Sequence, residues 1–158
     1  MTLQEGAVVE PVACSVWGLR RSKLEGNDKI LITGSGPIGL TTMMVAKAFG
    51  CGKICVTDIN ETRLTFAKKL GADYTLLVDP KLSPAEIAAK VNEIMGGPPD
   101  VAIDCTGVGS CIDTGIYAVR RGGKVTLMGL SSHSVQADLS TSSLKEVDLI
   151  AVARYDNT

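Results

Sequence analysis

A glycine-rich turn constrains the fold of this chain more than any other feature of the sequence. Three glycines share the spacing GxGxxG within the hexapeptide Gly34-Ser35-Gly36-Pro37-Ile38-Gly39. The turn directly follows the apolar run of residues 29–33 and opens a stretch with helical spacing that ends near Phe49. In such a unit Gly34 permits the tight turn, Gly36 lets the backbone approach a bound group, and Gly39 lets the helix pack closely on the strand. Free N–H groups at the helix N-terminus favour phosphate, so the turn predicts a dinucleotide site. The alternative is a glycine turn that binds no ligand.

Strand and helix patterns alternate along the rest of the chain. Short apolar runs predict six strands, at residues 29–33, 53–57, 74–78, 101–105, 124–128 and 147–153. Helices are predicted from the glycine turn to residue 49 and over residues 61–70, 83–95 and 110–119. The third of these helices opens with Ser83 as N-cap, Pro84 at its first position and Glu86 three residues after the cap. The strand runs are unbroken, which is typical of parallel strands buried on both faces. The predicted fold class is therefore α/β, a doubly wound six-stranded parallel sheet of Rossmann type with strand order 3-2-1-4-5-6.

An acidic residue closes the second strand. Asp58 lies about 20 residues after the glycine turn, where a carboxylate can accept hydrogen bonds from the adenosine ribose and repel the 2′-phosphate of NADP. The predicted coenzyme is therefore NAD. Two other interpretations stay open: a solvated acid that caps the next turn, and a methyltransferase, whose loop usually lacks the Pro37-Ile38-Gly39 ending. Arg63 would support NADP in another setting, but beside Asp58 we expect it to pack along the adenine ribose or to pair with the acid.

The segment before the first strand is predicted to lie outside the sheet. Helical spacing of apolar residues covers residues 3–19 and is interrupted at Pro11, and residues 25–28 indicate a turn into the first strand. We expect residues 1–28 to be the remnant of a connection to a missing preceding domain. Residues 29–158 are then the NAD-binding Rossmann domain.

Composition argues against several other classes of protein. Apolar residues make up 45% and charged residues 21% of the chain, and the formal net charge is −1 without a block of like charge. Neither nucleic acid nor a membrane is favoured as a partner, and no apolar stretch is long enough to span a bilayer. The five cysteines are odd in number and lie mostly in apolar runs, which predicts free buried thiols, Cys51 and Cys55 among them, and a reducing compartment, the cytoplasm. His133 is predicted to lie in a surface loop.

Motifs distributed from residue 5 to the end of the chain resemble those of one family. They are Glu5-Gly6-Ala7, Glu10-Pro11, the glycine turn with Leu40, residues 56–60 with Arg63-Leu64, Asp104-Cys105-Thr106-Gly107, and residues 152–158. Together they resemble the zinc-dependent medium-chain alcohol dehydrogenases, and within that family the enzymes that act on polyols. The combination is far more selective than the glycine motif alone. The resemblance implies the coenzyme-binding part of an enzyme that transfers hydride from a secondary alcohol of a polyol to NAD and gives a ketose.

The resemblance also implies roles for individual residues. Coenzyme contacts are implied at the glycine turn and at the ends of three strands: Gly34, Gly36, Pro37, Ile38, Gly39, Asp58, Arg63, Met128, Gly129, Leu130, Val152, Ala153 and Arg154. Thr106 lies near the point where the strand order reverses and is expected to line the cleft. Arg154 and Tyr155 are implied to reach the polyol as well. Glu10 is implied to face the catalytic zinc, through a water molecule.

The zinc ligands of the family, a Cys and a His-Glu pair on an amino-terminal domain, have no counterpart in this sequence. No complete metal site is therefore expected here, and zinc is expected only in the full-length enzyme, which the resemblance implies to be a homo-oligomer, a tetramer. Zinc in this family polarises the substrate oxygen while hydride moves to the nicotinamide. We expect the isolated chain to bind NAD weakly and to turn over nothing. Two alternatives remain: a non-catalytic NAD-sensing module of the same fold, and a ketose reductase that prefers NADP.

Overall fold

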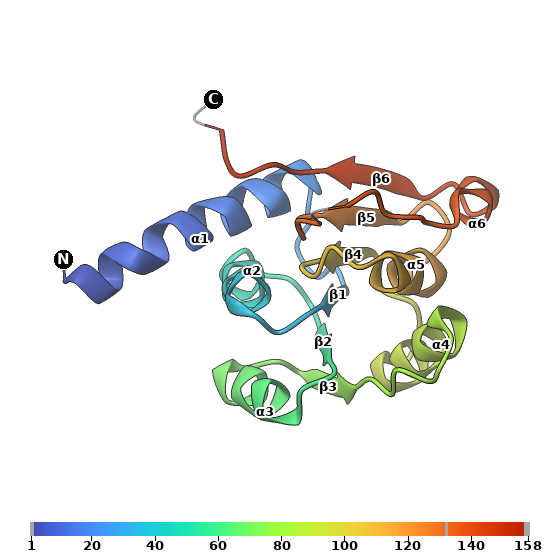
Figure 1. The fold of residues 1–158 in the computed structure, drawn as a ribbon, viewed down its shortest axis with the longest axis horizontal. Helices are drawn as coiled ribbons and strands as arrows, with labels where there is room; N and C mark the ends of the chain where they lie inside the picture. The colour runs from blue at the N-terminus through green and yellow to red at the C-terminus, as the bar shows by residue number, and fades with distance from the viewer. Residues whose placement is uncertain (1, 132, 157–158) are drawn as a thin grey trace.

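The computed structural model describes residues 2–131 and 133–156. One sheet of six parallel strands has the order β3-β2-β1-β4-β5-β6 (Figure 1). The strands are β1 (Ile30–Thr33), β2 (Ile54–Asp58), β3 (Tyr74–Leu77), β4 (Val101–Asp104), β5 (Lys124–Leu127) and β6 (Asp148–Ala151). The helices are α1 (Leu3–Arg21), α2 (Pro37–Ala48), α3 (Glu61–Leu70), α4 (Pro84–Met95), α5 (Gly109–Ala118) and α6 (Leu139–Leu144). The predicted Rossmann fold and strand order are confirmed, with strand ends that differ from the prediction by one or two residues.

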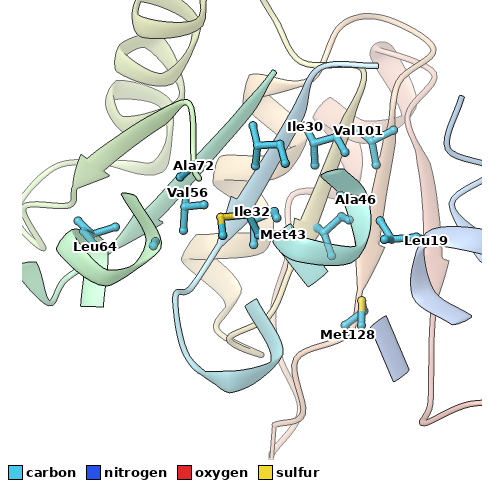
Figure 2. Packing of buried hydrophobic residues seen from close by; sticks show 13 residues of the cluster. Leu19, Ile30, Ile32, Met43, Ala46, Val56, Leu64, Ala72, Val101 and Met128 are labelled. Atoms are coloured by element: carbon cyan, nitrogen blue, oxygen red, sulfur yellow. The ribbon is translucent and has the colours of Figure 1, made fainter. Parts of the chain in front are cut away.

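The apolar strands divide their side chains between two hydrophobic cores, because successive residues of a strand point to opposite faces of the sheet. In β1, Ile30 and Ile32 face one core and Leu31 faces the other. The first core is covered by α1, α2 and α3, and Figure 2 shows Met43 and Ala46 of α2 beside the β1 side chains. The second core is covered mainly by α4 and α5. A sheet covered on both faces needs apolar residues at every position of its central strands, which explains the unbroken runs.

The two edge strands are less covered than the central ones. No residue of β6 is buried, and Leu149 is 36% exposed. In β3, Leu77 is exposed and the other residues are only partly buried. The expectation of burial on both faces therefore holds for β1, β2 and β4, and in part for β5.

The first helix runs without a break from Leu3 to Arg21, so the predicted interruption at Pro11 is wrong. Proline in a helix interior removes one hydrogen bond, but two features compensate here. A capping box between Thr2 and Glu5 holds the first turn, and the half of the helix after Pro11 packs on the first core. The half before Pro11 is exposed and extends away from the sheet (Figure 1). No helix among residues 2–131 and 133–156 combines the length and hydrophobicity needed to cross a bilayer.

The C-terminal end of α1 is joined to the sheet by buried contacts. Leu19 is fully buried in the first core. The hydroxyls of Ser22, just after the helix, and Thr126 of β5 lie 2.7 Å apart, and both side chains are buried. Gly18 lies so close to the Met128 side chain that a Cβ there would overlap its sulfur. This part of α1 therefore packs with the Rossmann core, and the division of the chain at residue 28 stays a prediction.

The loop between β5 and β6 contains α6, which the sequence analysis did not predict. This helix has only six residues, and four of them are serine or threonine, which have modest helix propensity. Asp138 caps it by accepting a hydrogen bond from the Thr141 N–H. The start of α4, by contrast, is as predicted, with a capping box between Ser83 and Glu86.

Candidate coenzyme site

The glycine turn places a helix N-terminus at the carboxyl end of β1. Gly36 is the N-cap residue of α2 and has no side chain to accept hydrogen bonds from the first N–H groups of the helix. A Cβ on Gly36 would meet no atom within 4 Å, so the space over this backbone is open. Open space over free N–H groups at a helix N-terminus fits the approach of a pyrophosphate.

The other two glycines of the turn are required by their surroundings. Gly34 has φ +94°, in the left-handed region that side chains rarely adopt, and a Cβ there would lie 2.8 Å from Cγ2 of Thr106. A Cβ on Gly39 would overlap the carbonyl oxygen of Gly34, a backbone atom that can move only if the turn opens. Each of the three positions therefore favours glycine for a different structural reason.

Asp58, at the end of β2, is held by hydrogen bonds from two sides. The N–H and the hydroxyl of Ser35 both donate to Oδ2 at 2.7 Å, and the N–H of Asn60 donates to Oδ1 at 2.9 Å. Partial burial opposes ionisation, but these bonds and the charge of Arg63 outweigh it and hold the pKa of Asp58 below its ordinary value. The carboxylate is therefore ionised at neutral pH. Sequence reasoning treated Ser35 as a spacer, and its role becomes visible only when the turn and the end of β2 meet.

Arg63 lies near Asp58 without forming an ion pair with it. Its side chain is exposed on the first turn of α3. Arg120 and Asp100, by contrast, do form an ion pair, at 2.7 Å. The direct pairing with Asp58 that the sequence suggested is therefore not observed, although the positive charge contributes to the low pKa of Asp58. Packing of Arg63 along an adenine ribose stays a prediction.

A buried carboxylate organises the point where the strand order reverses. Asp104, at the end of β4, is 2% exposed and accepts hydrogen bonds of 2.6 to 3.1 Å from Thr33, Thr106 and Gly107. These bonds hold the loop after β4 against the glycine turn, where Thr106 lies beside Gly34. Sequence analysis quoted Asp104 only as part of a family motif. An acid at the end of a buried strand, followed two residues later by threonine, is the signal that could have identified its role.

The segment after β5 crosses close to the same loop. Gly129 has no room for a Cβ, because the backbone of Thr106 and Gly107 lies against it. Met128 is 9% exposed and packs on α1, whereas Leu130 is 84% exposed. Of the three predicted residues here, one is thus in the core, one is in a tight backbone contact and one faces solvent.

Glu10 belongs to a second region, formed by α1 and the segment after β6. Its side chain is exposed, and its Oε1 accepts a hydrogen bond from the Cys14 thiol at 3.2 Å. Burial raises the pKa of Cys14 to about 11, the Glu10 carboxylate adds to the rise, and the positive charge of Arg154 opposes it. The charge of Arg154 therefore acts on the Cys14 thiol, to which Glu10 is hydrogen-bonded.

The four predicted residues after β6 differ in how firmly they are held. Val152 is half-buried, packs on the first core and donates its N–H to the Leu127 carbonyl. Ala153 and Arg154 are exposed, and Arg154 has φ +56°, in the left-handed region. Tyr155 is 46% exposed. Among residues 2–131 and 133–156, no hydrogen bond or ion pair links these four side chains to the glycine turn.

Cysteine, histidine and acidic side chains form no metal centre in the described part of the chain: no three of them are grouped so that they could hold an ion. All five cysteines are free. Cys55 is fully buried as predicted, and burial raises its pKa to about 12, whereas Cys51 is only half-buried. His133 is exposed, as predicted.

Comparison with known proteins gives matches along the whole chain. Residues 37–158 match the sequence model of a family described as zinc-binding dehydrogenase. Over 158 residues the chain is 44% identical to sorbitol dehydrogenase of Homo sapiens and 42% identical to that of Mus musculus. The fold matches the crystal structure of 2R,3R-butanediol dehydrogenase from Bacillus subtilis with a TM-score of 0.83, at 29% identity over 99% of this chain. The chain spans 44% of the length of each of these three proteins. The predicted similarity to polyol dehydrogenases is confirmed.

Proposed function

The chain belongs to the zinc-binding dehydrogenase family, and from that premise we propose that it is the coenzyme-binding part of an NAD-dependent polyol dehydrogenase. The reaction would oxidise a secondary alcohol of a polyol such as sorbitol to a ketose. One observation supports the proposal most strongly. The open N-terminus of α2 begins at Gly36, directly after Ser35 in the chain, and Ser35 donates two hydrogen bonds to the ionised carboxylate of Asp58. A dinucleotide needs this combination, one group for its pyrophosphate and one for its ribose.

The residues of this site supply binding and orientation. The N–H groups of Gly36 and Ile38 would receive the pyrophosphate, and Asp58 would accept hydrogen bonds from the adenosine ribose. We place the nicotinamide half beside Gly129 and the segment of residues 152–154, with Thr106 lining the cleft between them. Bound NAD supplies an acceptor for hydride at C4 of its nicotinamide. The negative charge of Asp58 would disfavour the 2′-phosphate of NADP.

Substrate contacts are proposed for the region of α1 and the chain after β6. Arg154 and Tyr155 are exposed and would donate hydrogen bonds to polyol hydroxyls. Glu10 is exposed and would face the zinc site through water. The described residues do not form a zinc-binding set, and we propose that the ion is bound in the full-length enzyme.

Assembly and location are inferred from kinship. We propose a homo-oligomer, a tetramer, for the full-length enzyme, and a cytoplasmic location. The exposed edge strand β6 is one surface on which copies could pair. The five free cysteines fit a reducing compartment.

Isothermal titration calorimetry of the purified 158-residue chain with NAD and with NADP tests the coenzyme proposal. We expect NAD to bind at least about tenfold more tightly than NADP, because Asp58 gains hydrogen bonds with one and is repelled by the other. Equal or tighter binding of NADP would contradict the assignment and favour a ketose reductase. Absence of binding by both would contradict the coenzyme role itself.

A second assay addresses turnover and the sensor alternative. With sorbitol and NAD, the isolated chain should form no NADH, in samples with and without added zinc. NADH is measured by its absorbance. Its formation in either kind of sample would contradict the proposal that the chain binds NAD without turnover. The sensor alternative is disfavoured by Glu10, Arg154 and Tyr155, since a module that only senses NAD has no need of groups directed at a polyol and a metal.

A further inference from the structure

The contact between the glycine turn and the end of β2 depends on a residue that the GxGxxG pattern leaves unspecified. Ser35 is 1% exposed, so its side chain is enclosed rather than available to solvent. Its hydroxyl donates to Oδ2 of Asp58 at 2.7 Å, and its N–H donates to the same oxygen at the same distance. Hydrogen bonds to a carboxylate at this distance are among the stronger ones in proteins. Only the one through the hydroxyl depends on residue type, because any residue except proline supplies the N–H.

The arrangement leaves a defined part of the carboxylate free. Each carboxylate oxygen can accept two hydrogen bonds. The two bonds from Ser35 occupy Oδ2, whereas Oδ1 accepts one bond, from the N–H of Asn60 at 2.9 Å. Asp58 is only partly buried, so Oδ1 retains a position for a ribose hydroxyl. With the hydroxyl of Ser35 in place, the carboxylate plane is set before any ligand arrives.

We propose that Ser35 is a positioning residue for the coenzyme: its hydroxyl holds the Asp58 carboxylate in the orientation that receives the adenosine ribose, and so contributes to the preference for NAD over NADP. This inference rests on the proposed function of the site. Ser35 acts through Asp58 and needs no contact with the coenzyme, since both of its donors are already engaged. Because the turn orders the carboxylate before NAD binds, the binding free energy is not reduced by the entropic cost of ordering a flexible side chain.

Titratable groups on neighbouring elements do not orient the Asp58 carboxylate. Arg63 of α3 contributes to the low pKa of Asp58 through its charge but forms no ion pair with it. The charge of Asp58 also acts on the Cys111 thiol of α5, but burial is the main cause of the raised pKa of Cys111. Neither group orients the carboxylate. The bonds from Ser35 and Asn60 do so.

The test is a double-mutant cycle in the 158-residue chain, with Ser35→Ala, Asp58→Ala and the double variant, read by calorimetry with NAD and with NADP. Ser143→Ala serves as the matched control, since Ser143 is an exposed serine of α6 away from the site. We expect Ser35→Ala to weaken NAD binding by about three- to tenfold and to change NADP binding less, so that the preference for NAD narrows. In the Asp58→Ala background the same substitution should have no further effect.

A readout without coenzyme completes the test. NMR titration of the Asp58 carboxyl carbon in the wild type and in Ser35→Ala follows its pKa directly, and we expect the midpoint to rise in the variant because one donor to the charged form is lost. An unchanged midpoint, or NAD binding by Ser35→Ala as tight as in the wild type, overturns the inference. An equal loss of NAD affinity in the Asp58→Ala background also overturns it, since Ser35 would then contact the coenzyme directly. Failure of the wild type to prefer NAD overturns the proposed function and this role with it, while the carboxyl titration still reports whether Ser35 holds Asp58.

Discussion

Two regions of this molecule carry predicted functional residues, and they are built in opposite ways. The turn region consists of residues 34–39 with Asp58, Thr106, Gly107 and Gly129, and its members are held by backbone packing and by hydrogen bonds to the carboxylates of Asp58 and Asp104. The α1 region consists of Glu10, Cys14, Arg154 and Tyr155, of which all except Cys14 are exposed. Within it, the Cys14 thiol donates a hydrogen bond to Glu10.

The difference shows which kind of site each region is. In the turn region, glycines make room and the backbone supplies the donors, so the geometry is set before a ligand binds. The α1 region presents long polar side chains on an open surface, which cost conformational entropy when they are ordered. The chain therefore holds a preorganised coenzyme site beside a set of substrate groups that still has to be ordered.

The largest effect should come from filling the closest backbone contact of the turn region. Gly39→Ala would place a methyl group on the Gly34 carbonyl, and we expect a loss of about 3 kcal/mol in the free energy of unfolding, together with loss of NAD binding. Gly36→Ala is the matched control, because its Cβ meets open space. It should cost less than about 1 kcal/mol in stability and still weaken NAD binding. Urea denaturation and calorimetry measure both. Equal stability of the two variants would contradict the contact described here.

The next effect should appear in coenzyme preference. Asp58→Asn removes the charge at the end of β2 and should reduce the ratio of NAD to NADP affinity by about tenfold. Glu93→Gln, on the exposed side of α4, removes a charge without touching the site and should leave the ratio unchanged. Competition titrations with the two coenzymes measure the ratio. If the ratio of NAD to NADP affinity is unchanged in Asp58→Asn, discrimination between the coenzymes lies outside the turn region.

Acid should destabilise the protein partly through the turn region. The pKa values of Asp58 and Asp100 are both held below the ordinary value, each against partial burial, by hydrogen bonds from Ser35 and from Arg120 and Lys29 respectively. A carboxyl with a lowered folded pKa stabilises the fold above the unfolded pKa of about 4, and this contribution is lost as pH falls through the folded pKa. We therefore expect the urea concentration at the unfolding midpoint to decrease as the pH is lowered below about 4. In Asp58→Asn this decrease with pH should be less steep. An identical slope in the variant would contradict the contribution of Asp58.

The smallest effect is expected in the α1 region. Glu10→Gln should change the free energy of unfolding by less than about 0.5 kcal/mol, because the side chain is exposed. NAD affinity should stay within about twofold of the wild type, a change smaller than one hydrogen bond is worth. Denaturation and calorimetry on the same preparation give both values. A large loss of NAD binding would show that the two regions are coupled.

Local patterns were enough to predict the sheet and the turn. Unbroken apolar runs identify strands covered on both faces, and three glycines between a strand and a helix identify the turn. Each of these signals is contained within a short stretch of sequence. Asp58 was found for the same reason, from its place at the end of a strand. The contacts that hold it were not, since Ser35 and Asp58 are 23 residues apart and meet only when β1 and β2 pair.

Tertiary packing accounts for the local features that were predicted wrongly or missed. Pro11 disfavours a helix interior, but the buried half of α1 packs on the first core and the helix continues through the proline. α6 has little intrinsic helix propensity and depends on its Asp138 cap and on Ser142, whose hydroxyl donates to the Val147 carbonyl. The role of Asp104 likewise requires the pairing of β1 with β4, which brings Thr33 to it.

The hydroxyl pair that joins Ser22 to Thr126 also bears on the order in which the chain folds. The two residues are separated by 104 positions in sequence, so their contact closes a very long loop. Contacts of such length form late, after the local helices and the neighbouring strand pairs have reduced the entropy of closure. The junction between the end of α1 and β5 is therefore expected to form late, after Leu19 has packed with the side chains of β1 and α2 in the first core.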